Sequence, residues 1–183
     1  MQLIYKNYLK GALGILRFQF IRLFFFRRLT AKGLSFVGNK VSFFIQGQGK
    51  MILNGKISLN DYSRIHSTSY LEVGKNFYMN KFACVIAFDS IRIGDNVSIG
   101  QFTTILDHDH AYEKNEGGDI HFEGYNTSPV TIGNNVWIAN HCSILRGVNI
   151  GNNVIVGANT LVHKDVPDNC VVMGVPYKIV KKI

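Results

Sequence analysis

Residues 130–166 read VTIGNNVWIANHCSILRGVNIGNNVIVGANTLVHKDV, with an aliphatic residue at every sixth position. These positions are Ile132, Ile138, Ile144, Ile150, Val156 and Val162. A period of six fits neither an α-helix nor a plain alternating strand over this length, so it indicates a repeated supersecondary unit. Fixed periods of this kind are typical of solenoids, in which each turn buries its apolar side chains against its neighbours.

The same grid extends toward the N-terminus. The earlier triplets are Leu53, Leu59 and Ile65; Val73, Met79 and Val85; and Ile93, Ile99 and Ile105. Early triplets recur every 20 residues and the last two every 18, which places two extra residues at one corner of each early turn. Three six-residue faces per turn predict an all-β solenoid shaped as a triangular prism over residues 41–166, with a weaker capping turn at 41–49.

One excursion interrupts the grid between Ile105 and Ile132, at residues 107–128. It is rich in Asp, His, Glu, Gly and Asn, and we expect a long loop without regular structure of its own. Long loops on a rigid scaffold commonly carry function. The tail, residues 167–183, contains Pro167 and Pro176, which preclude regular strand pairing at those points.

Residues 1–40 carry most of the positive charge. The net charge is +8, and seven cations precede the first acidic residue, Asp61: Lys6, Lys10, Arg17, Arg22, Arg27, Arg28 and Lys32. Because the rest of the chain is left near roughly +1, a nucleic-acid-binding body is disfavoured. Three cysteines without metal-type spacing indicate free thiols in a reducing compartment.

The pattern over residues 2–32 predicts a basic amphipathic helix, interrupted near Gly11 and Gly14. On a helical wheel Lys6, Lys10, Arg17, Arg28 and Lys32 fall on one side, and arginines interrupt each apolar run before it reaches about 18 residues, too short to span a bilayer. One hypothesis is a helix on the inner face of the cell membrane, because its apolar side is aromatic. The other is packing on the solenoid end or on a sister subunit.

The segments IGDNVSIG, IGNNVWIA, IGNNVIVGANTLVHKDVP and MGVPYKIVKKI resemble the hexapeptide-repeat acyltransferases over about residues 50–183. The resemblance implies a left-handed parallel β-helix, a homotrimer, and transfer of acetyl from acetyl-CoA. Within the family the chain is most similar to sugar O-acetyltransferases of the maltose, galactoside and nodulation-factor type. The N-terminal helix and ILDHDH resemble acetyltransferases of capsule, lipopolysaccharide or exopolysaccharide assembly.

Acetyl transfer to a hydroxyl needs a base, and histidine accepts a proton near neutrality. The resemblance implies His110 as this base, and His108 is the second candidate because alternation points both side chains the same way. Asp107 and Asp109 are expected to orient the ring or contact substrate. His108 and His110 with Asp107 or His121 also suggest a metal site, but the H-x4-H pair of the related carbonic anhydrases is missing, so we expect no metal.

The resemblance also implies binding residues. Asn80 matches an asparagine that contacts the acceptor, whereas Ala87 and Phe88 stand where relatives carry acidic acceptor-binding residues. Acetyl-CoA contacts are implied for Trp137, Ala139, Asn140, Ala158, His163, Lys164, Lys178 and Lys181. Small residues would admit the pantetheine chain, and the lysines would meet its phosphates.

These features together predict a cytoplasmic, trimeric acetyl-CoA-dependent O-acetyltransferase that modifies a sugar of a surface polysaccharide or its precursor. Two alternatives stay open. One is N-acetylation of an amino sugar or a xenobiotic amine. The other is a non-catalytic β-helix scaffold that associates with membranes.

Overall fold

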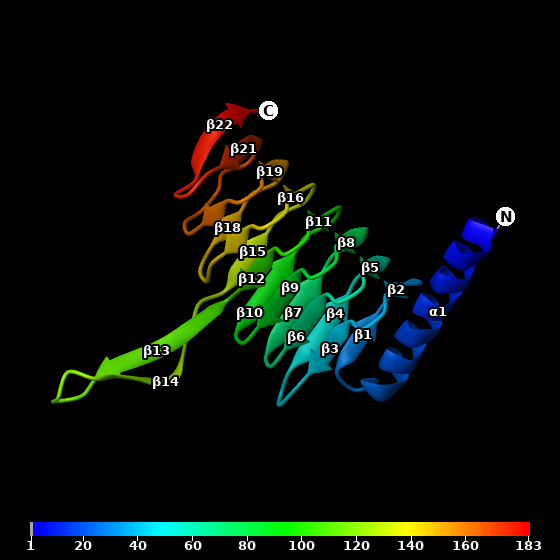
Figure 1. The fold of residues 1–183 in the computed structure, drawn as a ribbon, viewed down its shortest axis with the longest axis horizontal. Coiled ribbons are helices and arrows are strands. Elements are labelled where there is room, and N and C mark those ends of the chain that lie inside the picture. Colours follow the sequence, from blue (N-terminus) through cyan, green and yellow to red (C-terminus); the bar gives the residue numbers. More distant parts are fainter. Residues whose placement is uncertain (1) are drawn as a thin grey trace.

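The computed structural model describes residues 2–183, and their side chains from Tyr8 onward, so Lys6 of the predicted basic face lies outside the described side chains. Helix α1 (Gln2–Phe24) is followed by a solenoid of parallel strands, from whose side a hairpin projects (Figure 1). The expected all-β solenoid, a left-handed parallel β-helix, is confirmed.

The solenoid has three faces, each a sheet. Face A contains β1 (Leu29–Ala31), β4 (Lys50–Leu53), β7 (Tyr70–Val73), β10 (Ser90–Ile93), β15 (Val130–Ile132) and β18 (Asn149–Ile150). Face B contains β2 (Phe36–Val37), β5 (Ile57–Leu59), β8 (Phe77–Met79), β11 (Ser98–Ile99), β16 (Trp137–Ile138), β19 (Val154–Val156), β21 (Cys170–Met173) and β22 (Lys178–Lys182). Face C contains β3 (Ser42–Ile45), β6 (Arg64–Ser67), β9 (Cys84–Ala87), β12 (Thr104–Leu106), β17 (Ser143–Ile144) and β20 (Leu161–Val162).

The aliphatic grid forms the core. All fifteen grid side chains are at most 3% exposed. They also stack in register from turn to turn, as in the face A column Leu53, Val73, Ile93, Ile132 and Ile150. A second buried column lies two residues earlier on faces A and B, for example Met51 and Leu71 on face A. The core is therefore a continuous apolar column inside the prism.

The corner between faces A and B explains the IGNN sequence. A Cβ on Gly133 would lie 2.7 Å from the carbonyl carbon and oxygen of Gly151 in the next turn, so only glycine fits. The N–H of Asn134 donates to Asn152 Oδ1 at 2.8 Å, which ties the same two turns together. The third corner position adopts positive φ and forms an amide ladder through Asn76, Asn96, Asn135, Asn153 and Asn169.

The corner between faces B and C carries a ladder of stacked rings. Tyr62, Phe82, Phe102 and His141 follow one another with centroid separations of 5.1, 4.9 and 4.9 Å. The rings cover each other's faces and leave their edges exposed. His141 is thus part of a corner stack that stabilises the register of successive turns.

The solenoid is longer than the sequence predicted at both ends. Strand β1 pairs with β4 from Leu29 onward, so the helical segment is shorter than residues 1–40. In the tail, Val166 forms a bridge with Ile150, pairing stops at Pro167, and β21 resumes the parallel ladder beside β19. The six-residue spacing of aliphatic residues is irregular near both ends, so the sequence did not reveal these turns.

The excursion is ordered, contrary to the expected irregular loop. Strands β13 (His108–Lys114) and β14 (Ile120–Thr127) pair antiparallel and extend away from the prism (Figure 1). Their side chains are mostly exposed, so the hairpin has little core of its own within this chain.

Helix α1 packs against β1 and β2 at the first turn of the solenoid (Figure 1). The helix is unbroken, contrary to the expected interruption near Gly11 and Gly14. Gly14 instead permits close packing, because a Cβ there would be 2.4 Å from carbons of the Phe36 ring. Buried Phe18 follows one helical turn later. Among residues 2–183, no helix is long and apolar enough to cross a bilayer.

The predicted basic face of the helix is wrong in part. Lys10 bonds to Asp61 at 2.9 Å, and Arg17 donates to the backbone oxygen of Val37, so both cations contact the solenoid. Arg28 and Lys32 follow the end of the helix at Phe24 and do not belong to its face. The apolar side chains of α1 occupy two faces. One face, with buried Phe18, packs on the solenoid, and the other, with exposed Leu16 and Phe20, points outward.

Replacing Asp61 by asparagine is expected to flatten the acid dependence of stability. The hydrogen bond from Lys10 lowers the pKa of Asp61, with help from the N–H of Asn39 and the charge of Lys81. A carboxylate with a lowered folded-state pKa stabilises the fold above its unfolded pKa, and loses this contribution as the pH falls through the folded value. Urea unfolding from about pH 5 to about pH 3 should show the wild-type midpoint falling more than that of Asp61→Asn. Parallel curves would contradict the ion pair.

Candidate active site

His108 and Asp107 meet where the hairpin leaves face C. Asp107 is fully buried, and its Oδ1 lies 3.1 Å from Nδ1 of His108. The same carboxylate accepts the N–H groups of Phe88 and Asp89 at 2.8 Å each. Because an ionised carboxylate can only accept, Nδ1 of His108 donates and Nε2 carries the free lone pair. The pair therefore has the form of a histidine base oriented by a carboxylate.

The His108 ring is held in an aromatic box. Phe88 stacks on it with centroids 3.8 Å apart and planes 4° from parallel. Tyr125 from the hairpin stands perpendicular to both rings. A cleft of about 290 Å³ opens beside the box, lined by His108, Asp109, Leu145, Arg146 and His163. The geometry presents the His108 imidazole, with His163 also in the lining, to a cleft that a small reacting group can enter.

His110 lies further along the hairpin and is exposed. Its ring contacts Tyr125 and Phe122, at centroid distances of 4.9 and 6.0 Å. Among the hydrogen bonds of the described side chains, none reaches its ring nitrogens, and it does not line the cleft. The structure therefore separates the two candidate histidines, and its geometry favours His108.

Asp107 and Asp109 have different surroundings. The carboxylate oxygens of buried Asp107 hydrogen-bond to His108 and to two backbone N–H groups. This arrangement suits orientation of the ring rather than substrate contact. Asp109 accepts a hydrogen bond from Nε of Arg146 at 2.6 Å, and this bond lowers the pKa of the Asp109 carboxyl. The ion pair joins the first strand of the hairpin to the next turn of the solenoid, at the rim of the cleft.

The residues implied for acetyl-CoA lie along two different edges of the prism. His163 and Lys164 follow β20 at the edge between faces C and A, where His108 also lies. The others lie on face B or at its edge with face C: Trp137, Ala139, Asn140, Ala158, Lys178 and Lys181.

Within the second group, two residues share an outward row. Trp137 pairs with Ile155, Ile155 with Val171, and Val171 with Lys181. Three strand spacings, about 14 Å, therefore separate Trp137 from Lys181 along face B. Trp137 is half exposed and borders a hollow of about 440 Å³.

Asn80 belongs to the corner between faces B and C, where its Oδ1 accepts the N–H of Lys81. This corner and the His108 corner are opposite edges of face C, so the predicted acceptor and base residues do not meet within one chain.

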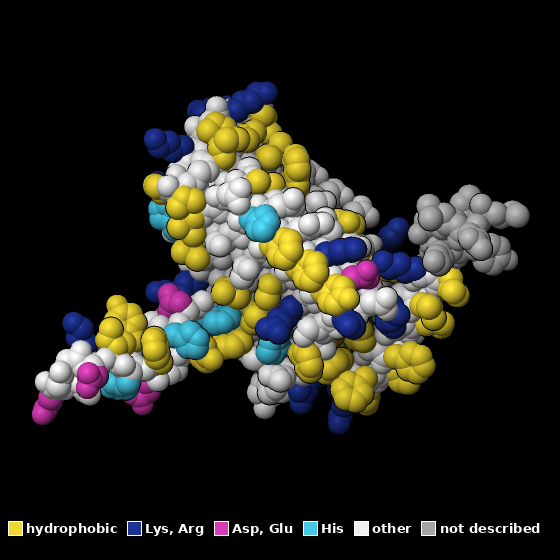
Figure 2. All heavy atoms as spheres, viewed as in Figure 1, with side chains coloured by type: hydrophobic (Ala, Val, Ile, Leu, Met, Phe, Trp, Pro, Cys, Tyr) yellow, Lys and Arg dark blue, Asp and Glu magenta, His cyan; other side chains and the backbone are white. Residues whose placement is uncertain are grey.

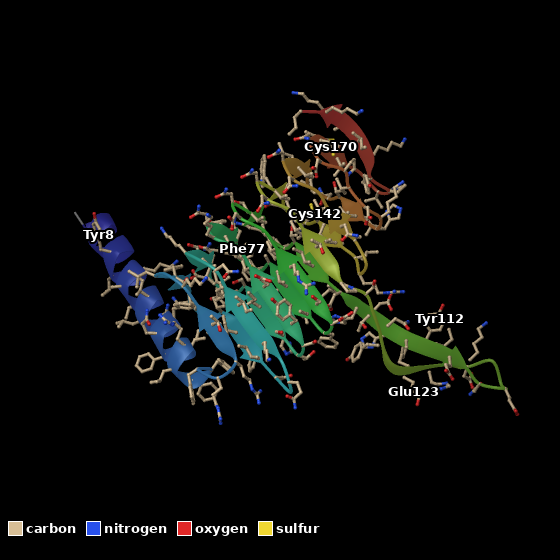
Figure 3. All side chains as sticks on the ribbon, turned by 180° about the vertical axis from the view of Figure 1, so that it is seen from behind. Tyr8, Phe77, Tyr112, Glu123, Cys142 and Cys170 are labelled. Carbon is tan, nitrogen blue, oxygen red and sulfur yellow. The ribbon has the colours of Figure 1, made fainter. Side chains whose placement is uncertain are left out.

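A separate cluster of two glutamates and one histidine lies on the hairpin. Glu113, His121 and Glu123 are exposed and place one ligand atom each within 4.8 Å of the others. Figure 3 labels Glu123 on the projecting hairpin. His121 therefore does not join His108 and His110. The cysteines are free thiols, and burial raises the pKa of the Cys84 thiol, which disfavours a thiolate nucleophile.

Three residues around His108 were missed as site residues from the sequence: Phe88, Tyr125 and Arg146. Phe88 could have been found, because it precedes His108 by 20 residues, the length of one early turn. Tyr125 is brought to the His108 ring by the pairing register of the hairpin, which the six-residue repeat of the sequence does not indicate. Arg146 is a surface corner residue whose ion pair depends on the direction of the hairpin.

Comparison with known proteins identifies the class. The family model "Bacterial transferase hexapeptide (six repeats)" matches residues 129–164. A maltose O-acetyltransferase structure from Clostridium difficile 630 is 31% identical, with a TM-score of 0.54, over 86% of this chain and 71% of that chain. The protein therefore belongs to the hexapeptide-repeat acyltransferase family, as the sequence resemblance implied.

The names of two further relatives state a pathway or a bound ligand. The putative lipopolysaccharide biosynthesis O-acetyl transferase WbbJ of Escherichia coli (strain K12) is 34% identical, over 58% of this chain and 58% of that protein. A galactoside acetyltransferase solved in complex with coenzyme A is 28% identical, with a TM-score of 0.54, over 78% of this chain and 64% of that chain. The chain spans a little over half of the length of the curated relatives that it matches.

Proposed function

We propose that the protein is an acetyl-CoA-dependent O-acetyltransferase that acts on a sugar hydroxyl, with His108 as its general base. The observation that carries this proposal is the His108 ring, whose Nδ1 is bonded to buried Asp107 while the side chain lines a cleft. Asp107 is the positioning residue. Coenzyme A in the galactoside acetyltransferase relative supports the choice of donor.

The proposed step is direct transfer. Nε2 of His108 removes the hydroxyl proton as the sugar oxygen attacks the thioester carbonyl, and a tetrahedral intermediate forms. When the C–S bond breaks, the same nitrogen returns the proton to the sulfur, which leaves as the CoA thiol. Atoms and charge balance without a covalent enzyme intermediate, and Asp107 stabilises the transient imidazolium.

The predicted binding residues lie on two opposite edges of face C, which supports active sites formed between neighbouring chains of a homotrimer. His108, His163 and Lys164 lie at one edge of face C, whereas Asn80, Asn140 and Ala158 lie at the other. Two prisms placed side by side would bring these edges together, with the hairpin reaching across the groove. In this arrangement Lys164, Lys178 and Lys181 would meet the phosphates of acetyl-CoA.

The proposed acceptor is a sugar of a surface polysaccharide or its precursor. Similarity to the putative lipopolysaccharide O-acetyl transferase supports this class. Phe88 stacks on His108, and this apolar ring beside the base favours an acceptor with an apolar patch over a fully hydroxylated one. We place the enzyme in the cytoplasm, where acetyl-CoA and activated sugars occur together.

The test is release of CoA thiol from acetyl-CoA with a panel of sugars, nucleotide sugars and amino sugars. Formation of an ester-linked acetyl group in proportion to CoA release would support O-acetylation. Transfer to amines alone would overturn it in favour of N-acetylation. No transfer to any acceptor would favour a non-catalytic scaffold.

A further inference from the structure

The outer face of α1 is an apolar stripe. Leu9, Leu13, Leu16, Phe20 and Leu23 are exposed, with Phe20 72% and Leu23 73% accessible. Their alternating spacing of four and three residues places them on one side of the helix. The opposite side, with Gly14 and Phe18, is already packed on the solenoid. The stripe is therefore an apolar surface in addition to the contact that holds the helix in place.

Exposed cations lie in the last turn of α1 and in the segment that follows it. Arg22, Arg27, Arg28 and Lys32 are exposed, and no acidic residue precedes Asp61. Figure 2 shows hydrophobic side chains over α1 with Lys and Arg side chains near its lower end. An apolar cavity of about 340 Å³ opens there between the Phe24–Arg28 segment and Ile45. Because Asp61 is engaged by Lys10, the surface has one sign of charge.

We infer that the outer face of α1 docks on an anionic lipid bilayer surface. The stripe would insert into the boundary between headgroups and acyl chains, and the four cations would meet lipid phosphates. This orientation differs from the sequence-based helical wheel, because Lys10 and Arg17 contact the solenoid and cannot anchor lipid. It goes beyond the proposed activity, because none of these residues belongs to the His108 cleft.

A second copy of α1 is a less suitable occupant. The spacing of the stripe also fits a helix pair, in which charged residues beside the seam form salt bridges between helices. Helix α1 contains no acidic residue that could supply the anionic half of such salt bridges. Two such helices would bring like charges together, whereas an anionic surface complements them.

The test is co-sedimentation of the full chain with vesicles of phosphatidylcholine, alone or mixed with phosphatidylglycerol. The variant Leu16→Glu/Phe20→Glu is expected to lower the partition coefficient on mixed vesicles at least about tenfold. The matched control is Ile120→Glu/Phe122→Glu on the hairpin, where Phe122 is also 72% exposed. This control adds the same charge and should bind as the wild type does.

A second variant tests the cations. Arg27→Gln/Arg28→Gln should bind mixed vesicles about tenfold more weakly, and bind phosphatidylcholine vesicles as the wild type does. Equal binding by the wild type, the glutamate variant of the stripe and the Arg27→Gln/Arg28→Gln variant, each checked for a wild-type circular dichroism spectrum, would overturn the inference. It would also be overturned if the glutamate variant lowered the molar mass in lipid-free solution, because the stripe would then bind a second copy. Acetyl transfer to a soluble acceptor is a separate readout, so failure here leaves the proposed function intact.

Discussion

Replacing His108 by alanine is expected to lower kcat/KM for acetyl transfer by about 10²- to 10⁴-fold, the usual contribution of a general base. The reason is positional. Nδ1 of His108 is bonded to buried Asp107, and the ring is clamped against Phe88, so Nε2 has a fixed direction at the cleft. The measurement is steady-state CoA release with whichever acceptor gives the highest rate.

His110→Ala is the matched control, because it removes the same ring two residues away. We expect its kcat/KM to change by less than about tenfold, since the His110 ring packs near the hairpin residues Phe122 and Tyr125 and does not line the cleft. A large loss in His110→Ala with little change in His108→Ala would reverse the assignment.

Replacing Gly133 by alanine is expected to lower the free energy of unfolding by about 2–4 kcal/mol. The added Cβ would lie 2.7 Å from backbone atoms of Gly151, and backbone cannot rotate away as a side chain can. Relief requires separation of two turns, which also strains the bond from Asn134 to Asn152. The urea midpoint measured by circular dichroism reports this loss.

Gly11→Ala is its control. A Cβ at Gly11 has no neighbour within 4 Å, and alanine favours the helix interior, so we expect stability to be unchanged or raised by up to about 1 kcal/mol. Equal midpoints for the two variants would show that the turns of the solenoid do not pack as closely as the corner geometry indicates.

The fold was predictable because one period determines it. Every grid residue from Leu53 to Val162 is buried in the expected column, since each turn repeats the contacts of the one before. Two features lie outside the period, and although their positions were predicted, the pairing within the excursion and the orientation of the helix were not. The hairpin is held by its own cross-strand pairs, and the direction of α1 depends on contacts with Asp61 and Phe36, which lie 51 and 22 residues from Lys10 and Gly14.

The site was predictable in composition and less so in geometry. Alternation places His108 and His110 on the same side of a strand, so it cannot choose between them. The choice depends on the burial of Asp107, a consequence of its position at the last residue before the hairpin. The separation of the binding residues into two groups follows from the three corners of each turn, because consecutive corners along the chain lie on different edges of the prism.

Rapid-quench transfer from [¹⁴C]acetyl-CoA tests most directly whether His108 promotes direct acetyl transfer. In a single turnover, we predict that label moves to the acceptor in step with CoA release and that no label remains on the protein. In His108→Ala, both acetyl transfer and CoA release should be slowed by the same large factor. Label held by the protein before it reaches the acceptor, or transfer by His108→Ala at the wild-type rate, would contradict direct transfer with His108 as the base.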